Sequence, residues 1–205
     1  TLSAKESSKG DRVVDGQGNA VLSQRLSTGE LVFLAKDVPA LGSAHFRVMK
    51  GAAVQEGGCS VQGTTLENEF LQVRLDEKTG NIVSVQRKGE AYNYIDTSVD
   101  GGANSFAWLS ANKDLPHADT VTAVSVVEKG PLVVELRVDS KAKGCRSVSR
   151  SVRLVSGLPW VEISNTVDKL PWEEKDGIHF GFGFNIPQST TKVDIPWGVM
   201  EVEKD

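Results

Sequence analysis

The sequence has few of the side chains that build metal centres and nucleophilic catalytic sites. Its 205 residues include three histidines and two cysteines. His45, His117 and His179 stand far apart and form no H-x-H or H-E-x-x-H pattern, and Cys59 and Cys145 match no metal-ligand spacing. We therefore expect no metal or other cofactor in this chain. We expect free thiols, because a chain of this length needs no disulfide to fold; one bridge between the two cysteines is the alternative.

Two further absences limit the partners. The formal net charge is −4 and the 23 Lys and Arg residues are scattered, so the positive field that holds a nucleic acid is missing. No stretch approaches the roughly 18 consecutive apolar residues of a membrane span, and residues 1–10 lack the apolar core of a signal peptide. We expect a soluble chain that binds neither nucleic acid nor a membrane, with any targeting segment outside it.

Valine dominates the apolar residues and predicts strands. There are 27 valines against 16 leucines and 14 alanines, and β-branched side chains favour pleated surfaces over helices. No window shows a convincing helical period, whereas apolar and polar residues alternate in three pairs of segments joined by turn residues. The pairs are 71–75 with 82–86, 121–127 with 132–138, and 148–155 with 160–168. These hairpins predict an all-β fold, an antiparallel β-sandwich.

The segment 178–186 is expected to be a strand with two unequal faces. Phenylalanines at positions 180, 182 and 184 share one face with Ile186, whereas Gly181 and Gly183 leave the opposite face nearly bare. A strand of this kind lets another backbone or a ligand approach closely.

A change in composition divides the chain near residue 55. Residues 1–19 are polar and Gly-rich, which predicts a frayed or loop-like start, and short apolar runs between 20 and 48 predict three short strands. The small, flexible residues of 50–63 then mark a boundary. We therefore predict a small β unit over 1–54 and a β-sandwich over 55–205. The first residue is not Met and 198–205 alternate without a closing turn, so we expect a piece of a longer protein.

Residues 91–116 show no clear alternation and predict a long loop that carries aromatic side chains, the kind of segment where function concentrates. Trp108 in this segment and Trp172 further on could offer flat apolar faces to a sugar ring, although a packed or rim position is the simpler explanation. His117 and His179 are more simply explained as structural histidines.

A glycosidase needs two carboxyl groups, an acid and a base or nucleophile, about 5 to 9 Å apart across a cleft. The candidates are Glu67 with Glu69, Asp96 with Asp100, and the acidic residues of 173–176. A solvated edge or loop explains them more simply, so no acid/base pair is assigned.

Four segments occur together in a recognisable order. They are D-V-P-A-L-G at 37–42 followed by F-R-V at 46–48, L-E-N-E-F-L-Q-V at 66–73 with T-G-N-I at 79–82, G-P-L at 130–132, and V-E-I-S-N-T-V-D at 161–168. In this order and spacing they resemble the C-terminal β-domain region of the family 38 glycoside hydrolases, the α-mannosidases. The resemblance covers about residues 20–205.

The resemblance implies a small β-domain followed by the first part of a galactose-mutarotase-like supersandwich. It also implies that the family's zinc ion and nucleophilic aspartate belong to an N-terminal catalytic barrel outside these residues. The chain is then a non-catalytic portion whose partner is that catalytic domain and whose parent enzyme holds zinc.

The segment 102–106 resembles a loop near the family's active-site cleft, although many members have Tyr or Asn-Glu-Phe where this chain has Asn104-Ser105-Phe106. This adds Asn104 and Phe106 to Trp108 and Trp172 as candidate contacts to carbohydrate, in particular mannosides. A capped turn is the simpler role for Asn104. Two alternatives remain: a stand-alone carbohydrate-binding or adhesion module, and an aldose mutarotase that uses His117 or His179 with a glutamate.

Overall fold

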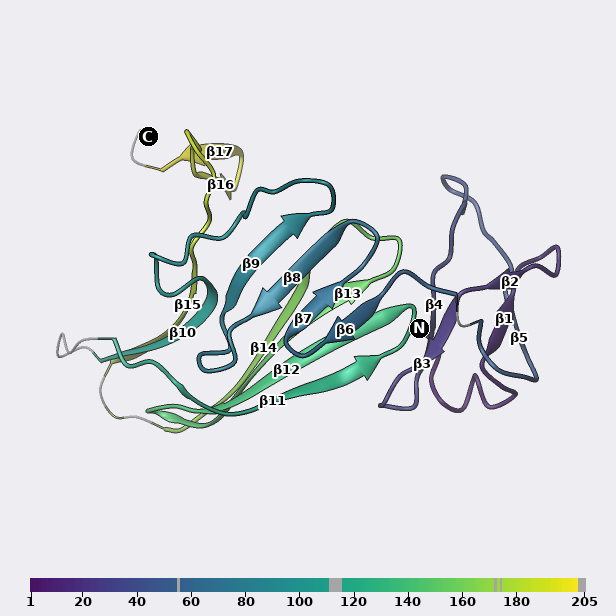
Figure 1. Cartoon of the computed structure of the whole chain (residues 1–205), viewed down its shortest axis with the longest axis horizontal. Coiled ribbons are helices and arrows are strands. Elements are labelled where there is room, and N and C mark those ends of the chain that lie inside the picture. The colour runs from purple at the N-terminus through teal and green to yellow at the C-terminus, as the bar shows by residue number, and fades with distance from the viewer. Residues whose placement is uncertain (55, 111–115, 172, 174, 203–205) are drawn as a thin grey trace.

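The computed structural model describes residues 1–54, 56–110, 116–171, 173 and 175–202. Strands are the only regular structure within these ranges, and all strand pairs are antiparallel (Figure 1). No helix with the length and apolarity needed to cross a membrane occurs in the part of the chain that the structure describes. The predicted all-β class is confirmed.

Two sheets form a sandwich. The first orders six strands as β15-β10-β9-β8-β7-β6, and the second orders four as β11-β12-β13-β14. The strands of the first sheet are β6 (Ser60–Gln62), β7 (Thr65–Glu67), β8 (Leu71–Leu75), β9 (Ile82–Arg87), β10 (Ala103–Ser110) and β15 (Asp176–Phe182). Those of the second are β11 (Thr120–Lys129), β12 (Val133–Lys141), β13 (Cys145–Val155) and β14 (Glu162–Lys169). The pairs β8/β9, β11/β12 and β13/β14 confirm the three predicted hairpins.

The main core lies between the two sheets. Leu66, Val73 and Leu75 of the first sheet pack in one buried cluster with side chains of β12 and β13, and burial of each such side chain contributes about 1.5–3 kcal/mol. The β12 and β13 members are Val134, Leu136, Val138, Val152 and Leu154. These buried residues stand at every second position of their strands, which is the alternation of apolar and polar residues seen in the sequence.

The six-stranded sheet is nearly split in two. β10 pairs with β9 through one residue pair, Ala103 with Ile82, and its register with β15 shifts between Ala103 and Ser105. Beyond this point the β10–β15 ribbon diverges from β9 (Figure 1). A second buried cluster, which includes Phe106, Trp108 and Val148, fills the space between this ribbon and the four-stranded sheet.

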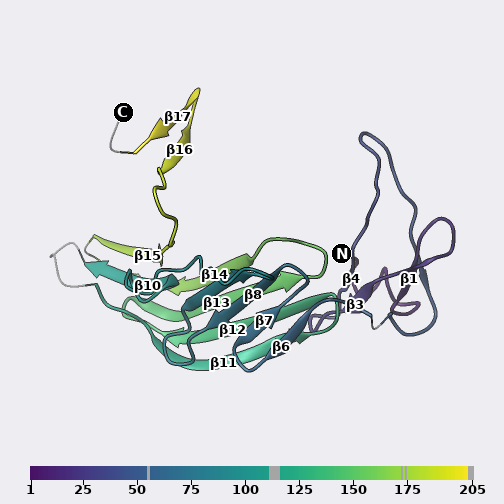
Figure 2. The same ribbon diagram turned by 45° about the horizontal axis from the view of Figure 1, so that its top comes forward.

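Smaller sheets lie outside the sandwich. β1 (Arg12–Val14), β2 (Ala20–Val21) and β5 (Arg47–Met49) form one, and β3 (Ser23–Arg25) with β4 (Leu31–Phe33) forms another. The hairpin of β16 (Lys192–Ile195) and β17 (Gly198–Glu201) stands away from the sandwich, at the end opposite these N-terminal strands (Figure 2).

The N-terminal strands are attached to the sandwich at the turn between β11 and β12. Leu26 packs in a buried cluster with Leu132 and Val133. The Gln24 side chain accepts hydrogen bonds from the Leu132 and Val133 amides and donates one to the Val133 carbonyl, at 2.8–3.2 Å. The predicted boundary at residue 55 lies outside the described residues and stays a prediction.

Two expectations about irregular segments were wrong. β1 lies within the predicted loop-like start, where Val13 and Val14 are buried because β1 pairs with two strands further along the chain. Likewise β10 lies within the predicted loop at 91–116. On β10 the buried residues Asn104, Phe106 and Trp108 stand at every second position. Because Asn104 is polar, the sequence does not show this alternation as a run of apolar residues.

The remaining local predictions are mostly confirmed. The strand predicted over 178–186 ends at Phe182, and Phe184 forms an isolated bridge with Ile95. The bare face does admit a neighbouring backbone, since a Cβ on Gly183 would lie 2.5 Å from the Asp96 carbonyl oxygen.

Both cysteines are free. Burial raises the pKa of the Cys59 thiol to about 12.

Candidate functional site

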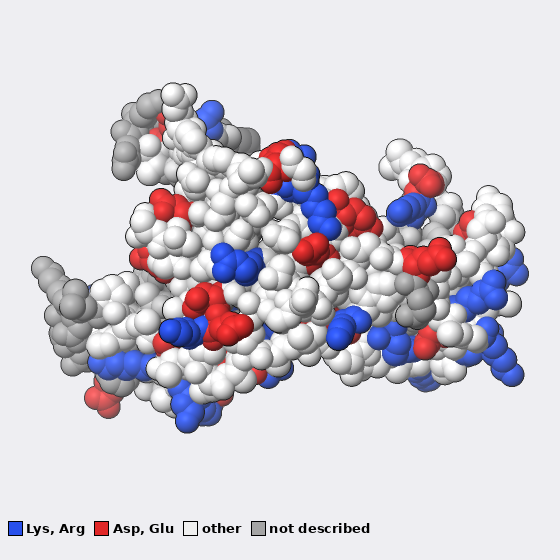
Figure 3. All heavy atoms as spheres, viewed as in Figure 1, with Lys and Arg blue, Asp and Glu red and all other residues white. Residues whose placement is uncertain are grey.

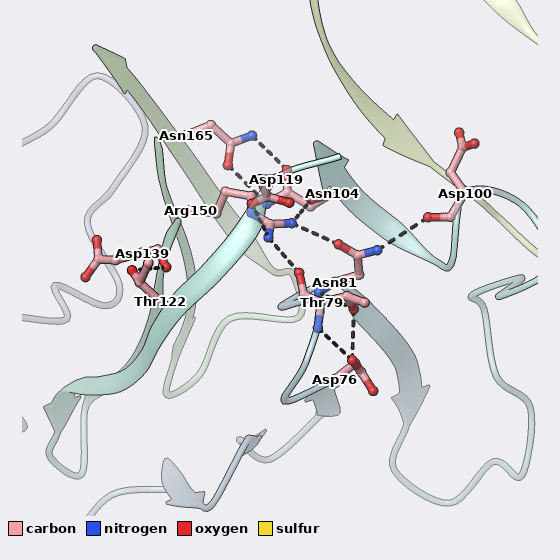
Figure 4. Close-up of polar contacts among 10 residues, drawn as sticks. All are labelled: Asp76, Thr79, Asn81, Asp100, Asn104, Asp119, Thr122, Asp139, Arg150 and Asn165. Atoms are coloured by element: carbon pink, nitrogen blue, oxygen red, sulfur yellow. Dashed lines mark hydrogen bonds and ion pairs between the residues drawn. The ribbon is translucent and has the colours of Figure 1, made fainter. Parts of the chain in front are cut away.

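A buried arginine, Arg150, lies where the two parts of the six-stranded sheet diverge (Figure 4). It projects from β13 of the opposite sheet, and its side chain is 1% exposed. Nη1 donates to the Asn81 side-chain oxygen at 2.9 Å and to the Asn104 carbonyl at 2.7 Å. Nη2 donates to the Thr79 carbonyl at 2.7 Å. Arg150 therefore joins the β8–β9 turn to β10.

The charge of Arg150 is balanced by Asp119, which precedes β11. Arg150 Nη2 lies 2.9 Å from Asp119 Oδ2, and the Asp119 side chain is 6% exposed. Burial lowers the pKa of the Arg150 guanidinium, and the Asp119 carboxylate opposes this shift. Because either charge would be costly to bury alone, replacing only one of the two residues would leave an uncompensated charge in the core.

Asn104 joins the two sheets from within the same network. Its side chain exchanges two hydrogen bonds with that of Asn165 on β14, and its backbone has a φ of 57°. Next to it, the Asn81 amide donates to the Asp100 carbonyl at 3.3 Å, and Asp100 has a φ of 51°. Such left-handed conformations of residues other than glycine persist where the surroundings fix them.

A cleft of about 620 Å³ opens beside this network. Its lining comes from the turns at 78–81 and 100–101, from β10, from 116–121 and from β15. Polar members are Lys78, Thr79, Asn81, Asp100, Ser105, Asp119, Thr120 and His179, and apolar members include Phe106, Leu109, Pro116 and Val121. The volume is within the range of small-molecule sites.

Residues 66–205 match the family model described as glycosyl hydrolases family 38 C-terminal domain. The chain belongs to this family. The match confirms the family resemblance and contains three of the four motifs, whereas the motif at 37–48 lies outside it. It covers both sheets of the sandwich from β7 onward. A search of curated proteins gave no match.

In this family 38 domain, the predicted carbohydrate-contact residues are largely internal. Asn104, Phe106 and Trp108 are 1%, 4% and 0% exposed. The Trp108 indole donates to Asp176 Oδ2 at 2.9 Å and has Lys143 Nζ 4.6 Å from its ring centroid. Trp172 lies outside the described residues. Of the three that the structure describes, Phe106 lines the cleft. Carbohydrate contact by any of the four stays a prediction.

Three of the candidate carboxylates, those of Glu67, Glu69 and Asp96, serve local structure. Glu69 accepts from the Ser156 hydroxyl at 2.5 Å and from the Gly157 amide at 3.0 Å, whereas Glu67 accepts from Gln72 and pairs with Lys88. Hydrogen bonds lower the pKa of Glu67. Asp96 accepts from the Ser98 amide and hydroxyl. These contacts hold the carboxylates in turns and strand pairs.

The family 38 domain gives no fit for zinc within the residues that the structure describes. Among them, no group of three or more His, Cys, Asp or Glu side chains is placed to hold a metal ion. Acidic and basic side chains are interspersed on the face of the sandwich seen in Figure 3.

Sequence reasoning missed Arg150 and Asp119. A signal was present for the arginine, because Val148, Arg150 and Val152 occupy alternate positions on β13. An arginine in line with core valines indicates a buried charge that needs several partners. No comparable signal marks Asp119, which is distant in sequence and lies outside any strand.

Proposed function

We propose that this family 38 domain is a non-catalytic β-sandwich portion of an α-mannosidase-type glycoside hydrolase. It supports the catalytic domain of the parent enzyme and contributes to carbohydrate binding. The observation that carries the proposal is the family match over residues 66–205. The geometry supports it, because the candidate carboxylates Glu67, Glu69 and Asp96 are engaged by neighbouring donors and do not line the cleft beside Arg150.

A turnover assay tests the non-catalytic role. The purified chain is incubated with an aryl α-mannoside, with and without added zinc, beside an active α-mannosidase as a positive control. We expect release of the aryl group in the control alone. Turnover by the purified chain that survives repeated purification would overturn the proposal.

The cleft beside Arg150 favours a second candidate, a stand-alone carbohydrate-binding module. Its volume of about 620 Å³ and its mixture of polar and apolar walls are typical of sites for small polar ligands. Calorimetric titration of the chain with mannosides distinguishes the two functions. Micromolar binding by the isolated chain favours the module, and weaker binding favours a contribution made together with a catalytic domain.

A further inference from the structure

The hairpin of β16 and β17 has one apolar face and one charged face. Residues opposite each other in an antiparallel pair point to the same side, so the pairing of the two strands assigns each side chain to a face. The apolar face carries Val193, Ile195 and Met200, and the other face carries the charged residues Lys192, Asp194 and Glu201. The hairpin stands away from the sandwich (Figure 2), and Val193 and Ile195 are exposed. Because a two-stranded hairpin alone is marginally stable in water, this apolar face needs a covering surface.

The turn of this hairpin presents a tryptophan on a strained backbone. Trp197 follows Pro196 in the two-residue turn, has a φ of 73° and is fully exposed. Glycine or asparagine normally holds such a left-handed turn position, and a bulky residue is strained there. Strain of this kind, together with a large apolar ring in water, indicates that the ring contacts another surface.

An apolar surface of matching character, the aromatic stripe, lies where β15 ends. It consists of three exposed residues, Phe182, Phe184 and Ile186. The rings of Phe182 and Phe184 stack with their centroids 6.0 Å apart. Asn185 fixes the stripe, because its amide donates to the Tyr94 carbonyl at 2.9 Å and its side chain donates to the Asn93 carbonyl at 3.0 Å. The stripe is therefore held in place before any partner binds, which lowers the entropic cost of binding.

The chain leads away from the sandwich between the aromatic stripe and the hairpin. Asn185 anchors the stripe, and residues 187–191 then run outward to β16 (Figures 1 and 2). Every copy of the chain carries both an uncovered hairpin face and an uncovered stripe. Two copies can therefore cover each other reciprocally about a two-fold axis, with the hairpin of each on the stripe of the other.

The surface covered by such an exchange is sufficient for a specific dimer. A tryptophan or phenylalanine ring buries roughly 150–250 Å² when it is fully covered. Trp197 exposes all of its surface, and Phe184 exposes 60%. Because the contact occurs twice, the exchange covers on the order of 1,200 Å², the lower end of the range for specific interfaces. The charged face of each hairpin stays in water, so its described charges need not be buried.

We propose that two copies of this chain associate by exchanging the β16–β17 hairpin, whose apolar face and Trp197 pack on the aromatic stripe of the other copy. Trp197 is the main anchor, because tryptophans near the centre of an interface carry a large share of the binding energy. Phe184 offers this ring an aromatic partner for an offset or edge contact. The association is independent of the proposed function, since it involves neither the cleft nor the catalytic domain of a parent enzyme.

Sedimentation equilibrium of the purified chain measures the association. We expect the mass to rise from that of one chain, 22.1 kDa, toward twice that value as the concentration increases through the micromolar range. Trp197→Asn removes the ring and supplies a residue that tolerates the left-handed turn. It should raise the dissociation constant of the dimer at least about tenfold.

A pair of lysine variants tests which face of the hairpin is used. Ile195→Lys places a charge on the apolar face and should raise the dissociation constant at least about tenfold. Val199→Lys is the matched control and should leave the dissociation constant unchanged, because Val199 is opposite Asp194 on the charged face. The sandwich should stay folded in both variants, because the hairpin stands away from it.

A pair of phenylalanine variants tests the stripe. Phe184→Ser removes an exposed ring of the aromatic stripe and should weaken the dimer about tenfold. Phe70→Ser, which removes an exposed ring between β7 and β8, should not weaken it. A chain that stays monomeric throughout the concentration range would overturn the proposal. Assemblies larger than a dimer, or a dimer that all of these variants leave equally strong, would overturn the reciprocal exchange as well.

Discussion

Asn104 and Asn165 bind each other across the sandwich through a reciprocal pair of amide hydrogen bonds. Asn104 Nδ2 donates to Asn165 Oδ1 at 3.0 Å, and Asn165 Nδ2 donates to Asn104 Oδ1 at 2.7 Å. Asn104 is on β10 and Asn165 on β14, so the pair ties the ribbon at the edge of one sheet to the edge strand of the other. The backbone carbonyl of Asn104 also accepts a hydrogen bond from Arg150. The edge of the sandwich is therefore held by directional bonds as well as by apolar packing.

Replacing Asn165 with alanine should destabilise the fold. Asn165→Ala leaves the buried Asn104 amide without its two partners, and an unsatisfied buried polar group costs about 1–3 kcal/mol. Urea unfolding followed by fluorescence measures the free energy of unfolding. The control is Thr166→Ala, whose exposed side chain lies next along β14 and which should change stability by less than about 0.5 kcal/mol. Equal effects of the two variants would contradict a specific role for the amide pair.

Two of the three salt-bridged arginines of β13, Arg150 and Arg146, should differ sharply in their contribution to stability. Arg150→Met leaves the Asp119 charge buried without its partner, for which we expect a loss of about 3–5 kcal/mol. Arg146→Met removes a pair with Asp168 whose arginine and carboxylate side chains are 64% and 47% exposed, and should cost about 0–1 kcal/mol. Equilibrium unfolding of both variants decides this. If Arg150→Met lowers the free energy of unfolding as little as Arg146→Met does, the buried network is dispensable for stability.

The alternation of the sequence predicted the hairpins because strand, turn and partner strand are neighbours in the chain. β8 with β9 and β11 with β12 are of this kind. β1 and β10 were missed because each also pairs with a strand far along the chain, β1 with β5 and β10 with β15, and their patterns gain meaning only from that pairing. The Arg150 network was missed for a similar reason. Its acceptors, from Thr79 to Asp119, come from turns that only the folded chain brings together.

Two glycines with left-handed backbones provide a matched test of packing around Trp108. Gly144 has a φ of 71° and a Cβ there would collide with the Trp108 indole nitrogen, whereas Gly63 has a φ of 57° and open space around it. Alanine at either position incurs a backbone cost of about 1–2 kcal/mol. Gly144→Ala should lose further stability, because the buried Trp108 ring and its hydrogen bond to Asp176 must shift. Calorimetric melting temperatures compare the two, and a smaller loss for Gly144→Ala than for Gly63→Ala would be inconsistent with this packing.

Acid should weaken the fold partly through Asp176. The pKa of this carboxyl is lowered by its hydrogen bond from Lys169 and, to a smaller extent, by that from Trp108. The folded chain therefore holds this proton less tightly than the unfolded chain does. The resulting stabilisation is present above the ordinary carboxyl pKa and is lost as the pH falls through the lowered value.

Asp176→Asn removes this titration. The variant should be less stable than the parent chain near neutral pH, and the difference should shrink as the pH falls below about 4, the ordinary pKa of an aspartate. Urea midpoints of both proteins at a series of pH values measure it. Other carboxyls with a lowered pKa, such as Asp76 and Glu67, titrate in both proteins and cancel in the comparison. Asp194→Asn, at an exposed position on β16, is the control and should follow the parent chain throughout. A difference between Asp176→Asn and the parent that stays constant with pH would show that the Asp176 charge does not stabilise this edge of the sandwich.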